Sequence, residues 1–303
     1  MSKPINRHSG VIVPMATPVT ADGDLDESGV RRVMDFLVDG GVHGVFVLGT
    51  TGEGASIDAA MRSQLVKTAV NHADGRCLVY GGIGDNCVAR SLEAAAEYHA
   101  HGVDAVVAHM PSYFPVGFEE IRRFFLDLAD NLSGPLIVYN IPPTTHISIP
   151  VELIGELCAH PNIVGLKDSE SNEKRLRTII ERFGDREDFA IQVGVAKHVL
   201  LGLELGADGF VPSSGNIDPD SCCGIFRHAK RGELEEARQA QEKMNAVGDF
   251  YQPGCALGET LSILKAAMSL KGLCEPHMLP PLQTKTDEEI AALRPGMEAL
   301  GIL

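Results

Sequence analysis

The sequence predicts an α/β fold: one (β/α)8 barrel, or TIM barrel, followed by a C-terminal helical extension. Two observations predict it. Eight short apolar runs alternate with segments of helical periodicity over about 215 residues, within the usual span of such a barrel. The runs are also apolar throughout, as expected of parallel strands that are covered on both faces. An open, doubly wound sheet is the alternative, but eight evenly spaced units without a glycine-rich dinucleotide loop favour closure.

The expected strands are rich in valine and isoleucine and are bounded by glycine, proline or aspartate. In order they are "GVIVPMAT" (10–17), "GVFVLG" (44–49), "CLVYGG" (77–82), "DAVVAHM" (104–110), "PLIVYN" (135–140), "NIVGLK" (162–167), "FAIQVG" (189–194) and "DGFVPS" (208–213). The phrases "DGGVHGVFV", "AHGVDAVV" and "ELGADGFV" share one junction from helix through glycine to strand, which indicates that one structural unit is reused along the chain.

Helical spacing of apolar residues fills the intervals between these runs. In residues 25–41, for example, valine, methionine and leucine side chains fall on one stripe that ends at two glycines. Further helices are expected in residues 56–73, 89–102, 118–132, 150–160, 171–184 and 196–207. Beyond about residue 225 the strand pattern ceases, and three more helices are expected in residues 232–251, 258–272 and 286–301. The predicted division is a barrel over residues 1–224 and a helical extension over residues 225–303, packed together as a single structural domain.

The charge of the chain argues against some classes of partner. There are 26 lysine and arginine residues against 41 aspartate and glutamate residues, which gives a net charge of −15. Nucleic acid and an anionic membrane surface are therefore not expected as partners. In addition, no apolar run in the sequence approaches the roughly 18–20 residues that a membrane-spanning helix needs.

The cysteines give an indication of the cellular compartment in which the protein resides. They are odd in number and widely spaced, without a pattern typical of zinc ligands, and we expect free thiols at all seven positions: 77, 87, 158, 222, 223, 255 and 274. The stretch "MSKPINRHSG" at the start has no apolar segment of the kind that a secretory signal carries. The expected location is therefore the cytoplasm, and no metal or other cofactor is expected.

Polar residues follow the expected strands at their C-terminal ends, where the chemistry of such barrels resides. After the second strand, "GTTGEG" (49–54) places Thr50 and Thr51 between glycines and ahead of a helix. Backbone N–H groups and the positive end of a helix dipole at this point would bind a carboxylate or a phosphate. The alternative is a turn that merely needs glycine, and the lysine of a P-loop is missing.

Lys167 ends the sixth expected strand, in "PNIVGLKDSE" (161–170), although its neighbours on that strand are apolar. An ordinary lysine would extend into solvent or pair with Asp168 or Glu170. A poorly solvated amine would instead act as a nucleophile towards a carbonyl carbon and form a Schiff base. Tyr139 ends the neighbouring fifth strand, and its hydroxyl is a candidate proton carrier. The alternative for the tyrosine is a half-buried ring with its hydroxyl in water.

Three motifs in this order, "GTTGEG", "YNIP" and "GLKDS", resemble those of the dihydrodipicolinate synthase / N-acetylneuraminate lyase family of class I aldolases. The resemblance runs from about residue 10 to about residue 300 and implies a Schiff base between Lys167 and pyruvate, with a proton relay through Tyr139. It also implies that the pyruvate carboxylate binds at Thr50 and Thr51. The other residues it implies are Gly49, Gly52 and Glu53, which shape that loop, and Val211, whose carbonyl group lies near the keto acid.

The resemblance implies a second tyrosine, which synthases of the family lend to a partner subunit across a dimer interface. It falls on Tyr113 in "MPSYFP" (110–115), where Ser112 stands in place of the first of two tyrosines. A homodimer or homotetramer is expected in consequence. The expected substrates are small molecules: pyruvate and an aldehyde, or a 2-oxo acid.

Departures from the family pattern bear on the second substrate. Thr144 stands where enzymes of lysine biosynthesis carry an arginine for the carboxylate of aspartate semialdehyde. Lys197 follows Ala196 where sialate lyases place an acidic pair. The expected reaction is therefore aldol cleavage, condensation or dehydration of a 2-keto-3-deoxy sugar acid or a 4-hydroxy-2-oxo acid. Candidate ligands for a polyol are Thr144, Thr145, Ser213 and Ser214, and candidate ligands for a distal carboxylate are Lys197 and His146.

Other functions stay open. Within the family they are dihydrodipicolinate synthase of lysine biosynthesis and N-acetylneuraminate lyase. A phosphate-binding barrel would need its site after the last two strands, where "VPSSGN" (211–216) is a weak candidate. A non-catalytic ligand-binding relative would be expected to lose the lysine or the tyrosine, and both are present. A metal-dependent aldolase would need converging ligands, and no carboxylate spacing supports His109, His146 and His198 in that role.

Overall fold

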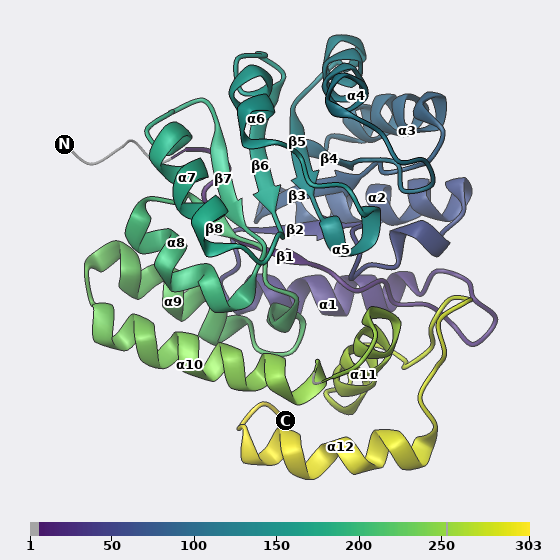
Figure 1. The fold of residues 1–303 in the computed structure, drawn as a ribbon. Coiled ribbons are helices and arrows are strands. Elements are labelled where there is room, and N and C mark those ends of the chain that lie inside the picture. Colours follow the sequence, from purple (N-terminus) through teal and green to yellow (C-terminus); the bar gives the residue numbers. More distant parts are fainter. Residues whose placement is uncertain (1–5, 253) are drawn as a thin grey trace.

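The computed structural model describes residues 6–252 and 254–303 and contains the predicted closed barrel (Figure 1). Eight parallel strands follow one another around the barrel in chain order, and β1 pairs with both β2 and β8. The strands are β1 (Gly10–Pro14), β2 (Gly44–Val47), β3 (Leu78–Gly82), β4 (Ala105–His109), β5 (Leu136–Asn140), β6 (Ile163–Asp168), β7 (Ala190–Val193) and β8 (Gly209–Phe210). The predicted fold class is thereby confirmed.

Each strand lies in the apolar run predicted for it, and β6 runs one residue further, to Asp168. β8 is the shortest strand, because Pro212 has no N–H group to donate and the chain then turns into η3 (Ser213–Asn216). Val211 still donates its N–H to the carbonyl oxygen of Val193 at 2.9 Å, just before that turn.

Helices surround the barrel on its outside (Figure 1). They are α1 (Glu27–Asp39), α2 (Ala59–Ala73), α3 (Val88–His101), α4 (Phe118–Asn131), α5 (Pro142–Thr145), α6 (Val151–Leu157), α7 (Glu173–Phe183), α8 (Val199–Leu205) and α9 (Pro219–Arg231). Ser56, where the second helix was expected to start, ends a short 3-10 turn, η1 (Gly54–Ser56), and α2 begins later, where Asp58 accepts the N–H of Met61.

α9 is not among the helices predicted from the apolar pattern, because small residues from Ser221 to Gly224 form much of its buried face. The predicted division between residues 224 and 225 falls inside this helix. Residues 1–5, which that division counts with the barrel, lie outside the described residues.

The barrel has two hydrophobic clusters, because successive side chains along a strand point to opposite faces of a sheet. The cluster between the barrel and its helices includes Val45, Val106 and Leu166. The cluster inside the barrel consists of Ile12, Phe46, Tyr80, Ala105, Val107, Ile137, Tyr139, Ile141 and Val211. With Leu166 directed outward, the next residue of β6 is directed into the barrel.

The predicted C-terminal extension consists of α10 (Leu234–Tyr251), α11 (Leu257–Leu270) and α12 (Asp287–Ala299). These helices lie on the side towards which the arrows of β5 and β6 point in Figure 1, which is the carboxyl end of the strands. The extension therefore covers the end of the barrel at which active sites of this fold are found.

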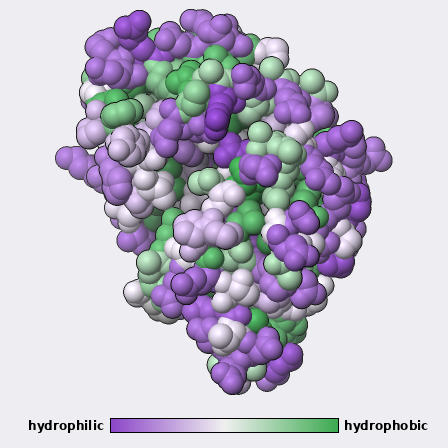
Figure 2. All heavy atoms as spheres, turned by 90° about the vertical axis from the view of Figure 1, so that its right-hand side faces the viewer, coloured by the Kyte–Doolittle hydropathy of each residue, from purple (hydrophilic) through white to green (hydrophobic). Residues whose placement is uncertain are grey.

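The outer surface is mainly hydrophilic on the face that Figure 2 shows. Hydrophobic side chains form smaller patches there, between the hydrophilic ones. Within the described residues, the structure contains no helix of sufficient length and apolar character to cross a membrane. Free thiols are confirmed at Cys77, Cys87, Cys158, Cys222, Cys223 and Cys274.

A buried hydrogen-bonded group fills the barrel near the amino ends of the strands. His8 is 5% exposed, and its Nδ1 lies 2.8 Å from the hydroxyl of Tyr80. Gln192 of β7 donates its side-chain N–H to the carbonyl oxygen of His8. Burial lowers the pKa of His8 to about 4, and the nearby Arg7 acts in the same direction. His8 is therefore neutral in the folded protein at neutral pH.

This lowered pKa predicts a loss of stability in weak acid. The unfolded chain takes up a proton at His8 below about pH 6.5, whereas the folded chain does so only near pH 4, so the free energy of unfolding falls as the pH drops through this window. The contribution of His8 is at most about 3 kcal/mol. Urea unfolding of wild type and His8→Gln at pH 7 and pH 4.5 measures it. We expect the stability difference between the two proteins to shift towards the variant at pH 4.5, and equal differences at both pH values would contradict the assignment.

Candidate active site at the carboxyl end of the barrel

Lys167 points into the barrel from the end of β6. Its Nζ lies over the ring of Tyr139, 4.0 Å from the ring centre, and 5.0 Å from the centre of the Phe46 ring. The residue is only 5% exposed. Tyr139 stands directly beside Lys167 in the register of β5 and β6, so the two strand ends do bring these side chains together. The amine is thus surrounded by aromatic faces at the mouth of the barrel.

The two acidic residues after Lys167 pair with Arg175 of α7 rather than with the lysine. Asp168 Oδ2 lies 2.9 Å from Arg175 Nη2, and Glu170 Oε2 lies 3.4 Å from Arg175 Nε. Asn140 of β5 donates to both carboxylates, at 3.1 and 3.2 Å. Burial raises the pKa of Asp168, and the Arg175 guanidinium opposes that rise. This network fixes the end of β6 against β5 and α7.

The "GTTGEG" loop leaves no room for a Cβ atom at any of its three glycines, and at Gly54 such an atom would lie 2.1 Å from the carbonyl oxygen of Leu48. A Cβ atom on Gly52 would lie 2.8 Å from the carbonyl oxygen of Met15. A Cβ atom on Gly49 would lie 2.7 Å from the ring of Phe46. Both distances are shorter than van der Waals contact, so the loop packs directly on β1 and β2 and holds its two threonines at the barrel mouth.

Glu53 joins this loop to the C-terminal extension. Its backbone is left-handed, with φ 55°, which is uncommon for a residue other than glycine. Its carboxylate pairs with Lys265 of α11, and the two side chains are 0% and 1% exposed. The Lys265 ammonium also donates to the carbonyl oxygen of His277 at 2.9 Å, while the second carboxylate oxygen accepts the N–H of Leu279 at 2.8 Å. Lys265 therefore helps to fix the shape of this loop, and the sequence pattern did not reveal that role.

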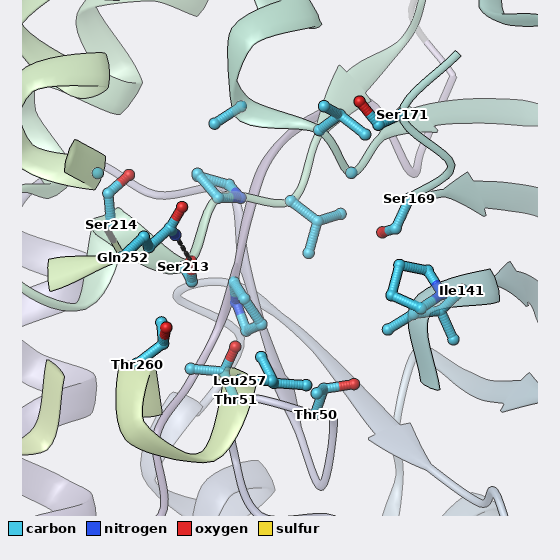
Figure 3. Close-up of a pocket in the computed structure, with 18 of the residues that line it drawn as sticks. Thr50, Thr51, Ile141, Ser169, Ser171, Ser213, Ser214, Gln252, Leu257 and Thr260 are labelled. Carbon is cyan, nitrogen blue, oxygen red and sulfur yellow. Dashed lines mark hydrogen bonds between the residues drawn. The ribbon is translucent and has the colours of Figure 1, made fainter. Parts of the chain in front are cut away.

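A cavity of about 480 Å³ lies at Lys167, between the barrel and the extension (Figure 3). In Figure 3, the threonines of the loop lie below, Ser169 and Ser171 lie on one side, and Gln252, Ser213 and Ser214 lie on the other. Of the residues predicted from the sequence, the structure brings together in its lining Thr50, Thr51, Tyr139, Thr144, Lys167, Val211, Ser213 and Ser214.

The predicted residues that are not in this lining are Gly49, Gly52, Glu53, Tyr113, Thr145, His146 and Lys197. Lys197 is exposed on the turn η2 (Ala196–His198), and His146 is exposed after α5. The structure therefore does not place the two candidate ligands of a distal carboxylate in the cavity. Tyr113 is 78% exposed in the loop before α4, where its ring packs on that of Phe114 with a centroid distance of 5.0 Å.

The lining also includes residues that the sequence did not single out. Ser169 and Ser171 follow β6 directly, so the rule that strand ends carry the chemistry could have found them. The extension contributes others: Gln252 after α10, Cys255, and Leu257, Thr260 and Leu261 of α11. Nothing in the local pattern of these residues indicates that their helices end at the barrel mouth.

A second cavity of about 380 Å³ adjoins the first and shares Thr50, Tyr139 and Thr144 with it. His109 of β4 lines this second cavity, and its ring meets that of Tyr139 edge to face at a centroid distance of 6.3 Å. Its Nδ1 lies 2.8 Å from the carbonyl oxygen of Met110. Burial lowers the pKa of His109, so the imidazole is neutral, with Nδ1–H donating to that carbonyl.

The histidines at the strand ends bear on the question of a metal site. In the parts of the chain that the structure describes, no group of three or more His, Cys, Asp and Glu side chains is placed to hold a metal ion. His109, His146 and His198 therefore do not converge on one point.

Comparison with known proteins identifies the class to which this barrel belongs. The model of the Dihydrodipicolinate synthetase family matches residues 7–300. The chain therefore belongs to this family of lyases, and the resemblance carried by the three motifs is confirmed.

Individual relatives match the chain over nearly its whole length. The "Probable 2-dehydro-3-deoxy-D-pentonate aldolase YjhH" of Escherichia coli (strain K12) is 32% identical and covers 99% of each chain. The 4-hydroxy-tetrahydrodipicolinate synthase of Methanosarcina mazei is 30% identical and covers 97% of this chain and 99% of its own. Among solved structures, that of YagE from E. coli K12 in complex with pyruvate has a TM-score of 0.92 at 28% identity and covers 98% of this chain and 99% of its own.

The buried pair of Glu53 and Lys265 predicts a specific pattern of stability. Lys265→Met leaves a buried carboxylate without its cation and is expected to lower the free energy of unfolding by about 3–5 kcal/mol. The double variant Glu53→Gln, Lys265→Met removes both charges and is expected to recover much of that loss. Urea unfolding of the single and double variants measures the coupling.

A matched control is Arg177→Met, which breaks the exposed ion pair of α7 between Arg177 and Glu173. This change is expected to have far less effect, because exposed ion pairs contribute little to stability. A double variant no more stable than Lys265→Met would contradict the role assigned to the buried pair.

Proposed function

We propose that the protein is a class I aldolase in which Lys167 forms a Schiff base with pyruvate. Its substrate is a 2-keto-3-deoxy sugar acid, or a 4-hydroxy-2-oxo acid of the same kind, which it cleaves to pyruvate and an uncharged hydroxyaldehyde or forms from them. Family membership supports the class of reaction, and the lining of the cavity supports the class of substrate.

One observation carries the choice of substrate. Among the described residues that line the cavity, Lys167 is the one charged side chain, and the other polar groups are hydroxyls, the amide of Gln252 and the thiol of Cys255. If Thr50 and Thr51 take the carboxylate of the keto acid, the rest of the cavity offers hydrogen bonds without charge. Neutral hydroxyl and amide groups suit a polyol, whereas a second carboxylate would call for an arginine or a lysine.

The proposed reaction starts with the amine of Lys167, which adds to C2 of the keto acid. Water leaves, and a protonated imine remains that accepts electrons from the C3–C4 bond. In cleavage, the C4 hydroxyl loses its proton, C4 becomes the carbonyl carbon of the aldehyde, and the bonding pair passes to C3 as an enamine. Protonation of C3 and hydrolysis of the imine then release pyruvate and the free lysine.

Tyr139 is the proposed proton carrier in these steps. Its ring lies against the Lys167 ammonium, so its hydroxyl belongs to the same end of the barrel as the reacting carbons. Thr50 lines both cavities together with Tyr139 and is the proposed link between the tyrosine and the carboxylate-binding loop. The carbonyl group of Val211, directly after β8, is the proposed neighbour of the keto acid.

The names of two relatives agree with this substrate class. YjhH is named a probable 2-dehydro-3-deoxy-D-pentonate aldolase, and YagE a putative 2-dehydro-3-deoxy-D-gluconate aldolase. Other relatives are named 4-hydroxy-tetrahydrodipicolinate synthase, which makes that activity the second candidate. It is the weaker candidate, because Thr144 lines the cavity where a guanidinium would be needed for the second carboxylate.

A homodimer or homotetramer in the cytoplasm is part of the proposal. In a single copy, Tyr113 and Phe114 are 78% and 70% exposed, which is unusual for neighbouring aromatic side chains. The second cavity offers a partner's Tyr113 a place beside Thr50 and Tyr139. The excess of acidic residues and the free thiols are compatible with a reducing compartment.

A panel of substrates tests the proposal. Pyruvate release is measured from 2-keto-3-deoxy-pentonate and 2-keto-3-deoxy-gluconate, and condensation of pyruvate is measured with aspartate semialdehyde. We expect kcat/KM to be at least about tenfold higher for the sugar acids, because the cavity lacks a cation for the second carboxylate. Lys167→Arg keeps the charge, loses the nucleophile and should lower kcat at least about a thousandfold. More efficient condensation with aspartate semialdehyde would overturn the substrate assignment.

A further inference from the structure

The C-terminal extension supplies one wall of the cavity, and that wall is polar. In Figure 3, Gln252 and Thr260 lie across the cavity from Ser169 and Ile141, which follow β6 and β5. A substrate held by its carboxylate and by C2 at the barrel mouth would direct its far end towards this wall. Gln252 and Thr260 are therefore placed to contact the part of the substrate that differs between one sugar acid and another.

Thr260 is a buried residue whose hydroxyl has no hydrogen-bond partner among the described residues. The residue is 8% exposed, and its backbone N–H donates to the carbonyl oxygen of Ala256 at 3.1 Å, but the structure records no hydrogen bond of its Oγ1 there. Hydroxyl residues inside helices commonly bond back to the carbonyl group one turn earlier. Ser262 of the same helix does so, with Gly258 at 3.0 Å. The Thr260 hydroxyl instead lines the cavity and is available to a ligand.

The start of α11 adds backbone donors beside Thr260. Ala256 holds the N-cap position and makes no side-chain hydrogen bond to the first turn. The first N–H groups of a helix have no partner within the helix, so without a capping side chain they are open to an oxygen atom from outside. Leu257 and Leu261 of the same turn line the cavity and give this wall an apolar border.

The side chain of Gln252 is oriented by hydrogen bonds of its own. Its Nε2 donates to the hydroxyl of Tyr251 at 3.0 Å and lies 3.5 Å from Ser213 Oγ. The hydroxyls of Tyr251 and Ser213 are 2.7 Å apart, and Tyr251 is 1% exposed. The amide is therefore hydrogen-bonded to the buried Tyr251 at the end of α10, and it presents polar atoms to the cavity in a defined direction.

We propose that Thr260 and Gln252 bind the terminal hydroxyl groups of the aldehyde half of the substrate, so that the C-terminal extension selects for hydroxylated chains. This inference rests on the proposed aldolase function and identifies residues that set its specificity. A hydroxyl group both donates and accepts, which matches the threonine hydroxyl, the amide and the N–H groups of the helix start. A substrate without the terminal hydroxyl leaves the buried threonine without a hydrogen bond, and it is discriminated against for that reason.

The experiment compares two substrates and measures pyruvate release. One is 2-keto-3-deoxy-pentonate, which carries a hydroxyl on C5, and the other is 4-hydroxy-2-oxopentanoate, whose C5 is a methyl group. In the wild type we expect higher kcat/KM for the pentonate. Thr260→Val keeps the shape of the side chain without its hydroxyl and is expected to lower the ratio of the two kcat/KM values about tenfold. Thr260→Ser restores the hydroxyl and is expected to restore most of the ratio.

Two further variants make the outcome specific. Gln252→Leu is expected to lower the same ratio. Thr68→Val is the matched control, because Thr68 is a threonine of α2 buried to the same degree, 9% exposed, and is not part of the cavity at Lys167. An unchanged ratio in Thr260→Val, or an equal loss on both substrates, would overturn the inference and leave the aldolase proposal intact. A wild type that cleaves neither substrate would overturn both.

Discussion

The rest of the site depends on the direction of one side chain, that of Lys167. Because side chains alternate along β6, the lysine points into the closed barrel while Asp168 points out and pairs with Arg175 at 2.9 Å. Asp168 and Glu170 therefore form ion pairs with Arg175 and not with Lys167. The Lys167 side chain lies over the Tyr139 ring instead. A lysine directed out of the barrel towards these carboxylates would not reach the cavity, whereas Lys167 lines the cavity and has access to a carbonyl carbon there.

The C-terminal extension completes the site at two places. Glu53 and Lys265 form a buried pair that joins the "GTTGEG" loop to α11, so the loop proposed to hold the keto-acid carboxylate depends on a helix far away in the sequence. The same helix presents Thr260 to the cavity at its first turns. The barrel alone thus provides the reactive amine, and the extension both steadies one side of the substrate site and forms its far wall.

The sequence predicted the parts of the structure that follow from local pattern. Apolar runs located all eight strands, and the parallel order around the barrel placed Lys167 beside Tyr139 because consecutive strands are neighbours. Long-range packing was beyond such reasoning. Lys265 and Thr260 lie in an ordinary amphipathic helix whose docking site is set by tertiary contacts. Lys197 and His146 lie close in sequence to lining residues, but short turns direct them to solvent: η2 carries the lysine, and a left-handed residue, with φ 58°, ends α5 at the histidine.

The most direct test of the account is covalent trapping on the lysine. The protein is incubated with pyruvate and sodium borohydride, digested, and the modified peptide is located by mass spectrometry. We expect a reduced pyruvyl adduct on the peptide that contains Lys167, with none formed in Lys167→Ala. An absence of adduct in the wild type, or an adduct on another lysine such as the exposed Lys197, would contradict it.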